Sequence, residues 1–383
     1  MDEAFALYVH VPWCRRVCPY CDFNVYADRR PPEADYSAAL VRELEAWATV
    51  PPWAGGRVAS VYVGGGTPSL FSADAIGRVL AAATGLFGLE PDAEVTLEAN
   101  PGTVTATTLR AYRDAGVNRL SLGAQSFAPR LLERLGRDHT PDEAEAAVAT
   151  AREVGLENVS LDLIFAVPGS TFADWTHDLE RAISLQPDHV SAYALTFEEG
   201  TPYHSWRRSG RLAAVDEDDE ATMAEHTATR LAIAGYERYE ISSWARPGHA
   251  SSHNQRYWDG SHYLGIGAGA HSFDAGPAGA KRWSNLRHPS AYMKAVAAGE
   301  SPVAETRPLE LEEARSDFVF TGLRRLVGVD DTRFAERFGL GLGDAFPQVP
   351  QLVRDGLLEW RGRNLRLSPH GLRFADTVAA SFV

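Results

Sequence analysis

Strand-like apolar runs alternate with amphipathic stretches along the first half of the chain. In one such stretch, for example, Leu40, Val41 and Leu44 lie at helical spacing. Neighbouring parallel strands need a crossover connection, usually a helix, so this alternation predicts a parallel sheet. The predicted strands span residues 5–10, 58–63, 94–99, 118–123, 159–165 and 189–195, and the predicted helices span residues 34–48, 73–87, 105–115, 141–154 and 172–184.

The number of predicted strands limits the fold. Six strands are too few to close an eight-stranded α/β barrel, so we expect an open, partial (β/α)6 barrel. Helix-start signals support the positions of the predicted helices. Ser72 precedes one of them, and Thr140 precedes another, with Glu143 three residues later.

The chain after residue 200 is less periodic. We expect a connection over 200–216, a helix over 217–235 and a short strand over 236–242. The acidic run 216–220 suits a helix N-terminus, where the helix dipole favours negative charge. The stretch 243–275 is rich in glycine, histidine and aromatic residues, and we expect it to be irregular.

The tail of the chain changes character. Helical stretches precede segment 357–368, which resembles a hairpin turning at 362–364, and a helix is expected after Ser368. Helices followed by a hairpin suggest a winged-helix-like module, whose expected role is packing rather than DNA binding. The expected units are therefore a barrel core at 1–200, an extension of that core at 201–305 and a mostly helical, winged-helix-like module at 306–383.

Charge and hydropathy exclude some functions. The chain has 37 Lys and Arg against 51 Asp and Glu, a net charge of −14, which argues against nucleic-acid binding because phosphate contacts need a basic face. The sequence contains no run of about 18 apolar residues, so no membrane-spanning helix is predicted. The acidic start MDEAFALYVHVPWC enters a strand-like run at once and lacks the features of a secretory signal. We therefore expect a cytoplasmic protein.

Three cysteines, Cys14, Cys18 and Cys21, lie within eight residues and directly follow the first predicted strand. An odd, clustered set is a poor disulfide framework. Thiolates are soft ligands, and three of them on one tight loop can each hold one iron of a cubane. The fourth iron is then open to a small molecule, as is the open position of a catalytic zinc. The alternatives are three buried cysteines, or a zinc site completed by His10 or Asp22.

Six short motifs follow one another between residues 8 and 165, each near the end of a predicted strand. Barrels and open α/β folds bind ligands at such strand ends. In this order the motifs resemble the radical S-adenosylmethionine (SAM) superfamily, in particular the branch of the oxygen-independent coproporphyrinogen III oxidases. They are Tyr8-Val9-His10-Val11-Pro12-Trp13-Cys14, Cys18-Pro19-Tyr20-Cys21-Asp22-Phe23, Gly64-Gly65-Gly66-Thr67-Pro68, Glu98-Ala99-Asn100-Pro101, Gly123-Ala124-Gln125-Ser126 and Leu161-Asp162-Leu163.

The resemblance implies a [4Fe–4S] cluster on the three cysteines, with SAM at the open iron. Glycines allow a close backbone approach, and the carboxylates of Glu98 and Asp162 can accept hydrogen bonds from ribose hydroxyls or the amino group. Arg137 can pair with the SAM carboxylate. For each polar residue taken alone, a helix cap or a surface pair is the alternative. The family's SAM contacts fall on Tyr8, Gly65, Gly66, Thr67, Glu98, Gln125, Arg137 and Asp162.

Two features of the sequence indicate which group within the oxidase branch this chain resembles. Phe23 stands where the oxidases carry a further cysteine, which argues against porphyrinogen decarboxylation. Segment 253–258, HNQRYW, resembles the motif that marks the HemW family of haem chaperones. An imidazole can ligate haem iron, and aromatic rings can line a slot for the macrocycle. The resemblance thus implies haem as cargo, with His253 as axial ligand, Asn254, Tyr257 and Trp258 near the ring, and His271 as the second candidate ligand.

The residues leave other roles open. His253 and Asn254 can instead bridge backbone groups, as buried polar residues usually do. The favoured function is a haem chaperone that holds the cluster and SAM and delivers haem to a membrane-bound acceptor protein, with transient membrane proximity at most and with a homodimer left open. The alternatives are an oxygen-independent coproporphyrinogen III dehydrogenase and another radical SAM enzyme of this branch, such as a methyltransferase.

Overall fold

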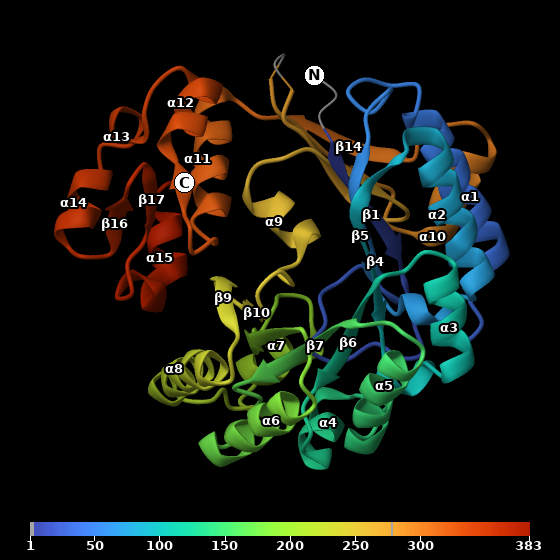
Figure 1. The fold of residues 1–383 in the computed structure, drawn as a ribbon, viewed down its shortest axis with the longest axis horizontal. Coiled ribbons are helices and arrows are strands. Elements are labelled where there is room, and N and C mark those ends of the chain that lie inside the picture. The colour runs from blue at the N-terminus through green and yellow to red at the C-terminus, as the bar shows by residue number, and fades with distance from the viewer. Residues whose placement is uncertain (1–3, 277–278) are drawn as a thin grey trace.

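The computed structural model describes residues 4–276 and 279–383 (Figure 1). Within these residues, one large sheet contains 12 strands. In chain order they are β1 (Phe5–Val11), β4 (Val58–Gly65), β5 (Leu89–Ala99), β6 (Arg119–Gln125), β7 (Asn158–Phe165), β8 (His189–Ala194), β9 (Glu237–Glu240), β10 (Ser243–Ala245), β11 (Tyr263–Ile266), β12 (His271–Asp274), β13 (Lys281–Asn285) and β14 (Val303–Pro308).

The spatial order of the strands is β14-β13-β12-β11-β1-β4-β5-β6-β7-β8-β10-β9. All neighbours from β11 through β1 to β8 are parallel, and the strands added at both edges are antiparallel. The six predicted strands thus form the predicted partial barrel. The sequence did not predict β11 as a further parallel strand beside β1.

Helices cover the convex side of the parallel strands in Figure 1. The predicted helices are all present, and their bounds agree within two residues. The additional helix α4 was not predicted because it is too short for a periodic pattern. The helices are α1 (Glu33–Trp47), α2 (Ala73–Phe87), α3 (Ala106–Asp114), α4 (Pro129–Leu135), α5 (Pro141–Glu153) and α6 (Phe172–Ser184).

Local sequence signals explain where these helices begin. The Ser72 hydroxyl accepts a hydrogen bond from Ala75 N at the start of α2. Thr140 and Glu143 form a reciprocal capping box at the start of α5. Asp216 caps α8 (Glu217–Ile233), so the acidic run lies at a helix N-terminus as predicted. The central strands are buried on nearly every residue, which is typical of parallel strands covered on both faces.

The prediction that 243–275 is irregular is wrong. This segment contains β10, α9 (Ser252–Trp258), β11 and β12. Each element is too short for hydrophobic periodicity to reveal it, and α9 is placed by tertiary contacts with β4 and with the C-terminal helix α11 (Leu311–Gly322). In Figure 1, α9 lies on the concave side of the sheet, facing the C-terminal helices. The predicted connection 200–216 contains the short helix α7 (Pro202–Arg208).

The C-terminal residues have a hydrophobic core of their own, built around Phe318, Phe334 and Leu365. The predicted hairpin is present as two paired strands that turn at Gly362 and Arg363. The division of the chain at residues 200 and 305 stays a prediction. After α11 the elements are β15 (Val329–Asp330), α12 (Asp331–Phe338), α13 (Leu342–Ala345), α14 (Val349–Arg354), β16 (Leu358–Arg361), β17 (Asn364–Leu367) and α15 (Ala375–Ala380).

None of the helices in the described part of the chain is long and apolar enough to cross a bilayer.

A buried carboxylate joins α1 to the added edge of the sheet. Glu43 on α1 accepts hydrogen bonds from Gly267 N at 2.9 Å, from Asn285 Nδ2 at 2.6 Å and from Tyr292 OH at 2.6 Å. Tyr292 belongs to α10 (Pro289–Ala297), which follows β13. Burial raises the pKa of Glu43 from 4.5 to about 7, although these hydrogen bonds oppose the shift. Folding therefore favours the protonated carboxyl.

We expect Glu43→Gln to remove a pH dependence of stability. A raised folded pKa stabilises the fold fully below pH 4.5, and this contribution is lost as pH rises through about 7. Between about pH 5 and about pH 8, the free energy of unfolding of the wild type should fall by on the order of 3 kcal/mol more than that of the variant, because the glutamine side chain does not titrate. Thermal unfolding at both pH values measures the difference. Parallel losses in the two proteins would contradict the prediction.

Candidate functional site

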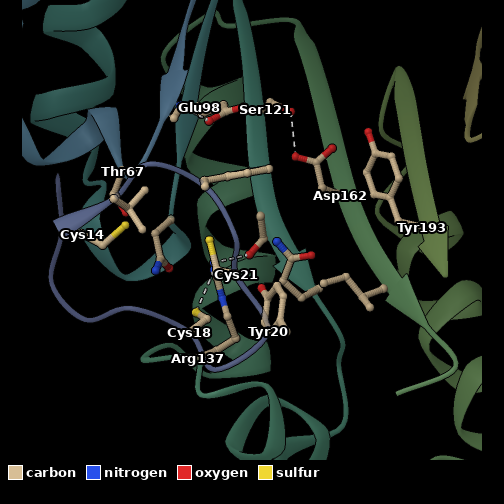
Figure 2. A pocket seen from close by; sticks show the side chains of 18 of the residues that line it. Cys14, Cys18, Tyr20, Cys21, Thr67, Glu98, Ser121, Arg137, Asp162 and Tyr193 are labelled. Carbon is tan, nitrogen blue, oxygen red and sulfur yellow. Dashed lines mark hydrogen bonds between the residues drawn. The ribbon is translucent and has the colours of Figure 1, made fainter. Parts of the chain in front are cut away.

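The carboxyl ends of the parallel strands open onto a cavity of about 530 Å³ (Figure 2). The cysteine loop forms one wall, and the ends of β4 to β8 form the others. Because side chains at the ends of neighbouring parallel strands meet at one edge of the sheet, residues far apart in the sequence converge here. A cavity of this size with convergent polar groups is typical of a ligand-binding site.

All three cysteines line this cavity, and none forms a disulfide. Cys14 ends the short strand β2 (Trp13–Cys14), which pairs with β3 (Tyr26–Ala27), whereas Cys18 and Cys21 lie on the loop between β2 and β3. Burial raises the pKa of the Cys14 thiol, and it raises the pKa of the Cys21 thiol to about 11. These thiols therefore need a bound cation to hold them as thiolates at neutral pH.

The zinc alternative lacks the ligand geometry. In the described residues, no group of three or more His, Cys, Asp and Glu side chains is arranged to hold a single metal ion. Both ring nitrogens of His10 are engaged, Nδ1 with Tyr8 OH at 3.0 Å and Nε2 with Asn24 O at 2.9 Å. Thiolates that each bind a different iron of a cubane lie farther apart than ligands of one ion. Because each cysteine of a cubane binds its own iron, a cluster does not require the three thiols to converge on one ion.

The glycine-rich end of β4 lies against the cysteine loop. Gly66 N donates to Val11 O at 2.8 Å and Thr67 N donates to Trp13 O at 2.7 Å. A Cβ on Gly66 would lie 2.5 Å from Trp13 O, and a Cβ on Gly65 would lie 2.5 Å from the His10 ring. Gly65 also has a φ of 112°, which favours glycine. The glycines are therefore required for the close contact that fixes the start of the cysteine loop.

Two carboxylates lie on the cavity wall, on strands that are separated by β6. Glu98 on β5 accepts hydrogen bonds from Tyr62 OH at 2.8 Å and from Gly65 N at 3.0 Å. Asp162 on β7 accepts from Ser121 Oγ at 2.9 Å (Figure 2). Burial raises the pKa of Glu98 to about 7 and also raises the pKa of Asp162. A ligand that donates hydrogen bonds or carries positive charge would stabilise the ionised form of both carboxylates.

Arg137 is an arginine of the cavity wall that lies beside the cysteines. Its Nη2 donates to Gly123 O at 2.8 Å, and its Nη1 lies 4.0 Å from Cys18 Sγ. Its buried Nε has no hydrogen-bond partner in the described residues. Burial opposes the charge, but the neighbouring Tyr20 and Cys18 raise the pKa of Arg137, so the guanidinium stays charged. An anionic group bound near the cysteines would satisfy it.

The structure brings together seven of the eight residues expected to contact SAM, and the exception is Tyr8. The Tyr8 ring stacks on Tyr62, and Tyr8 is not among the residues that line the cavity. The seven that line it are Gly65, Gly66, Thr67, Glu98, Gln125, Arg137 and Asp162.

Sequence reasoning missed several lining residues. Ser191 and Tyr193 lie two apart on β8 and therefore point to one face of the sheet, a period-2 signal that the sequence contained. Tyr20 lies between two of the cysteines and faces the cavity (Figure 2). Arg119 is almost fully buried at the start of β6, where its Nε lies 3.9 Å from Glu94 Oε2. An arginine within a predicted apolar strand is unusual, because arginine is rarely buried, and the sequence therefore contained this signal as well.

The residues expected to contact haem fall on both sides of α9. Asn254 lines the large cavity, whereas Tyr257, Trp258 and His271 line a second cavity of about 280 Å³. The second cavity lies between β11 to β13 and the C-terminal helices α11 and α12. Helix α9 thus borders two cavities on the concave side of the sheet.

His253 borders neither cavity. The side chain is fully buried, with Nδ1 2.9 Å from Ser60 Oγ and Nε2 2.8 Å from Tyr257 OH. Burial lowers the pKa of His253 to about 3, which keeps the ring neutral. An axial ligand needs an open nitrogen, and here a haem iron would have to displace one of these hydrogen bonds. The contacts fit a residue that ties α9 to β4, although the partners are side chains and not the backbone groups expected.

Comparison with known proteins shows the family to which this chain belongs. The sequence profile of the radical SAM superfamily matches residues 8–182, and that of the HemN C-terminal domain matches residues 309–374. A Bacillus subtilis protein named "Heme chaperone HemW" is 35% identical over 98% of both chains. A Mycobacterium tuberculosis protein of the same name is 38% identical over 100% of this chain and 95% of its own. This chain belongs to the HemW family of radical SAM proteins.

A solved structure shares the fold of this chain. Coproporphyrinogen III oxidase (HemN) from Escherichia coli matches with a TM-score of 0.85 over 100% of this chain and 90% of its own, at 22% identity. That likeness shows the fold alone. Membership of the radical SAM superfamily implies a [4Fe–4S] cluster and SAM. The donor set fits both, because three thiols on one loop, a guanidinium nitrogen without a partner in the described residues and two half-buried carboxylates surround one cavity.

We expect Gly66→Ala to displace the cysteine loop, because its Cβ would overlap the backbone of Trp13. Overpacking of this kind costs about 1–3 kcal/mol, so unfolding temperature and iron content after anaerobic reconstitution should both fall. Gly85→Ala in α2 is the matched control, since its Cβ would meet nothing within 4 Å, and it should gain about 0.5–1 kcal/mol. An unchanged iron content in Gly66→Ala would refute the expectation.

Proposed function

We propose that this protein is a haem chaperone that binds a [4Fe–4S] cluster and SAM and delivers haem to haem-requiring membrane proteins. The observation that carries the proposal is the full-length similarity to several proteins named "Heme chaperone HemW". The cavity supports it, because it gathers the donors that the cluster and SAM require. The net charge of −14 opposes adsorption to anionic lipid, which favours a protein acceptor over the bilayer surface itself.

In this proposal the large cavity holds the cluster and SAM. Cys14, Cys18 and Cys21 bind three irons, and the fourth iron offers SAM a place for its amino and carboxylate groups. The guanidinium of Arg137 pairs with the SAM carboxylate, which satisfies its open Nε. Glu98 and Asp162 accept hydrogen bonds from hydroxyl or amino groups of SAM, and the raised pKa values fall again once those donors are bound.

We place haem at the second cavity, with His271 rather than His253 as the axial ligand. His271 is exposed, and within the described residues its ring makes no hydrogen bond. Tyr257, Trp258 and Phe273 supply aromatic walls. With about 280 Å³ the cavity is below the usual size of a ligand pocket, so it receives one edge of the macrocycle while the rest extends toward the open side.

Charge at this cavity suits the haem propionates. Arg282 and Arg337 both line it, and Arg282 pairs with Asp317 at 2.8 Å. The Arg282 Nε is buried without a hydrogen-bond partner in the described residues. A propionate there would satisfy this nitrogen, as guanidinium groups bind carboxylates well.

We expect His271→Ala to weaken haem binding at least tenfold and to shift the Soret band, because the iron loses its ligand. His253→Ala should keep the Soret position but lower the unfolding temperature, at a cost of about 2 kcal/mol or more for two lost buried hydrogen bonds. Anaerobic haem titrations with thermal unfolding measure both. The exposed His370→Ala controls for adventitious surface binding. The opposite pattern, with only His253→Ala losing haem, would return the ligand role to His253.

We expect no oxidation of coproporphyrinogen by the reconstituted protein with SAM and a reductant. Phe23, 64% exposed at the lip of the large cavity, occupies the place of the further oxidase cysteine. Product analysis decides between carrier and catalyst, since protoporphyrinogen would overturn the proposal and a methylated substrate would favour a methyltransferase.

Measuring 5′-deoxyadenosine with and without haem on the same sample shows whether haem controls SAM cleavage.

A further inference from the structure

The end of β6 contains a tight turn centred on Gln125. Ser126 N donates to Ala124 O at 2.8 Å, and Gln125 has a φ of 64°. This geometry is that of a γ-turn with positive φ, which is rare and strained for a residue other than glycine. The register between β6 and β7 also shifts between Leu122 and Gln125. The backbone is therefore held here in a conformation that it would not adopt alone.

A buried carboxylate from α6 holds this turn. Asp178, 1% exposed, accepts from Ser126 Oγ at 2.5 Å through Oδ2 and from Phe127 N at 2.7 Å through Oδ1. On the other side, His139 Nε2 lies 3.0 Å from Ala124 O. Asp178 is not among the residues that line the large cavity. Its two oxygens thus hold the residues that directly follow Gln125 without reaching the cavity themselves.

The turn determines where the Gln125 amide lies. A Cβ on Gly123 would be 2.9 Å from Gln125 Nε2 and 3.1 Å from Arg137 Nη2, so both side chains lie over Gly123. Both also line the cavity. In a regular extended strand, residues 123 and 125 would point to one face about 7 Å apart. The shifted register and the positive φ at Gln125 set the direction from which its amide reaches Gly123.

We propose that Asp178 is a positioning residue for SAM binding, which acts by holding the Ser126–Phe127 backbone so that Gln125 faces the ligand beside Arg137. The inference rests on the proposed binding of SAM in this cavity. Backbone strain persists only where the surroundings over-determine it, and strained residues gather at binding sites. A helix can pack on a strand through apolar contacts alone, so a buried carboxylate with two hydrogen bonds to this turn indicates a role in its geometry.

The test compares SAM affinity, iron content and unfolding temperature in anaerobically reconstituted full-length protein, with affinity measured by equilibrium dialysis. Asp178→Ala should bind SAM about tenfold more weakly with unchanged iron content, the loss expected for one misplaced hydrogen bond to a charged ligand. Asp178→Asn should retain most of the affinity, because its oxygen can accept from Phe127 N while its amide donates to Ser126 Oγ.

Asp174→Ala is the matched control on the same helix. Asp174 forms the capping box of α6 with Thr171 and an ion pair with Arg130, and its carboxylate makes no hydrogen bond with Ser126 or Phe127. Its loss should destabilise α6 but leave SAM affinity unchanged. Should Asp178→Ala fail to fold, Ser126→Ala removes one of the two hydrogen bonds and should weaken SAM about threefold.

A double-mutant cycle with Gln125→Ala separates positioning from general destabilisation. If Asp178 acts through Gln125, Asp178→Ala should cause little further loss of SAM affinity in the Gln125→Ala background. An equal loss in both backgrounds, or wild-type affinity in Asp178→Ala and Ser126→Ala, would overturn the inference. Failure of the wild type itself to bind SAM would instead overturn the proposed function, and the inference with it.

Discussion

The close contact between the end of β4 and the cysteine loop is the constraint on which the site depends. Two backbone hydrogen bonds join Gly66 and Thr67 to residues 11 and 13, at a separation that no Cβ on Gly66 would allow. The first cysteine follows immediately. Because β1 and β4 are neighbouring parallel strands, this contact also orients the loop over the ends of β5 to β8, where the carboxylates lie and which the side chain of Arg137 reaches from the connection after α4.

Buried polar groups organise the rest of the molecule around that contact. Glu43 ties α1 to the added edge of the sheet, His253 ties α9 to β4, and Asp178 ties α6 to the turn at Gln125. Each group is satisfied by several hydrogen bonds, as a buried polar group must be to avoid a large desolvation cost. These ties position elements that hydrophobic packing alone would leave free to slide, because apolar contacts are not directional.

The partial barrel was predictable because its elements are long and periodic. The motifs at its strand ends predicted most of the cavity wall, since the topology of a parallel sheet brings strand ends together. The role of segment 253–258 was not predictable in the same way. Its histidine is a buried tie, Asn254 lines one cavity, and Tyr257 and Trp258 line the other, because a single short helix presents different faces to each.

The sequence by itself determined the alternation of strands and helices, the three-cysteine loop and the glycines that let β4 approach it, because these follow from local periodicity and from the absence of a side chain. Only the tertiary structure decided which polar residues face a ligand and which are internal ties. The motifs predict that Tyr8 and His253 contact a ligand, and nothing in the sequence marks Asp178, yet none of the three lines either cavity. Their roles depend on partners that lie up to 193 residues away along the chain and meet them only once the sheet has formed.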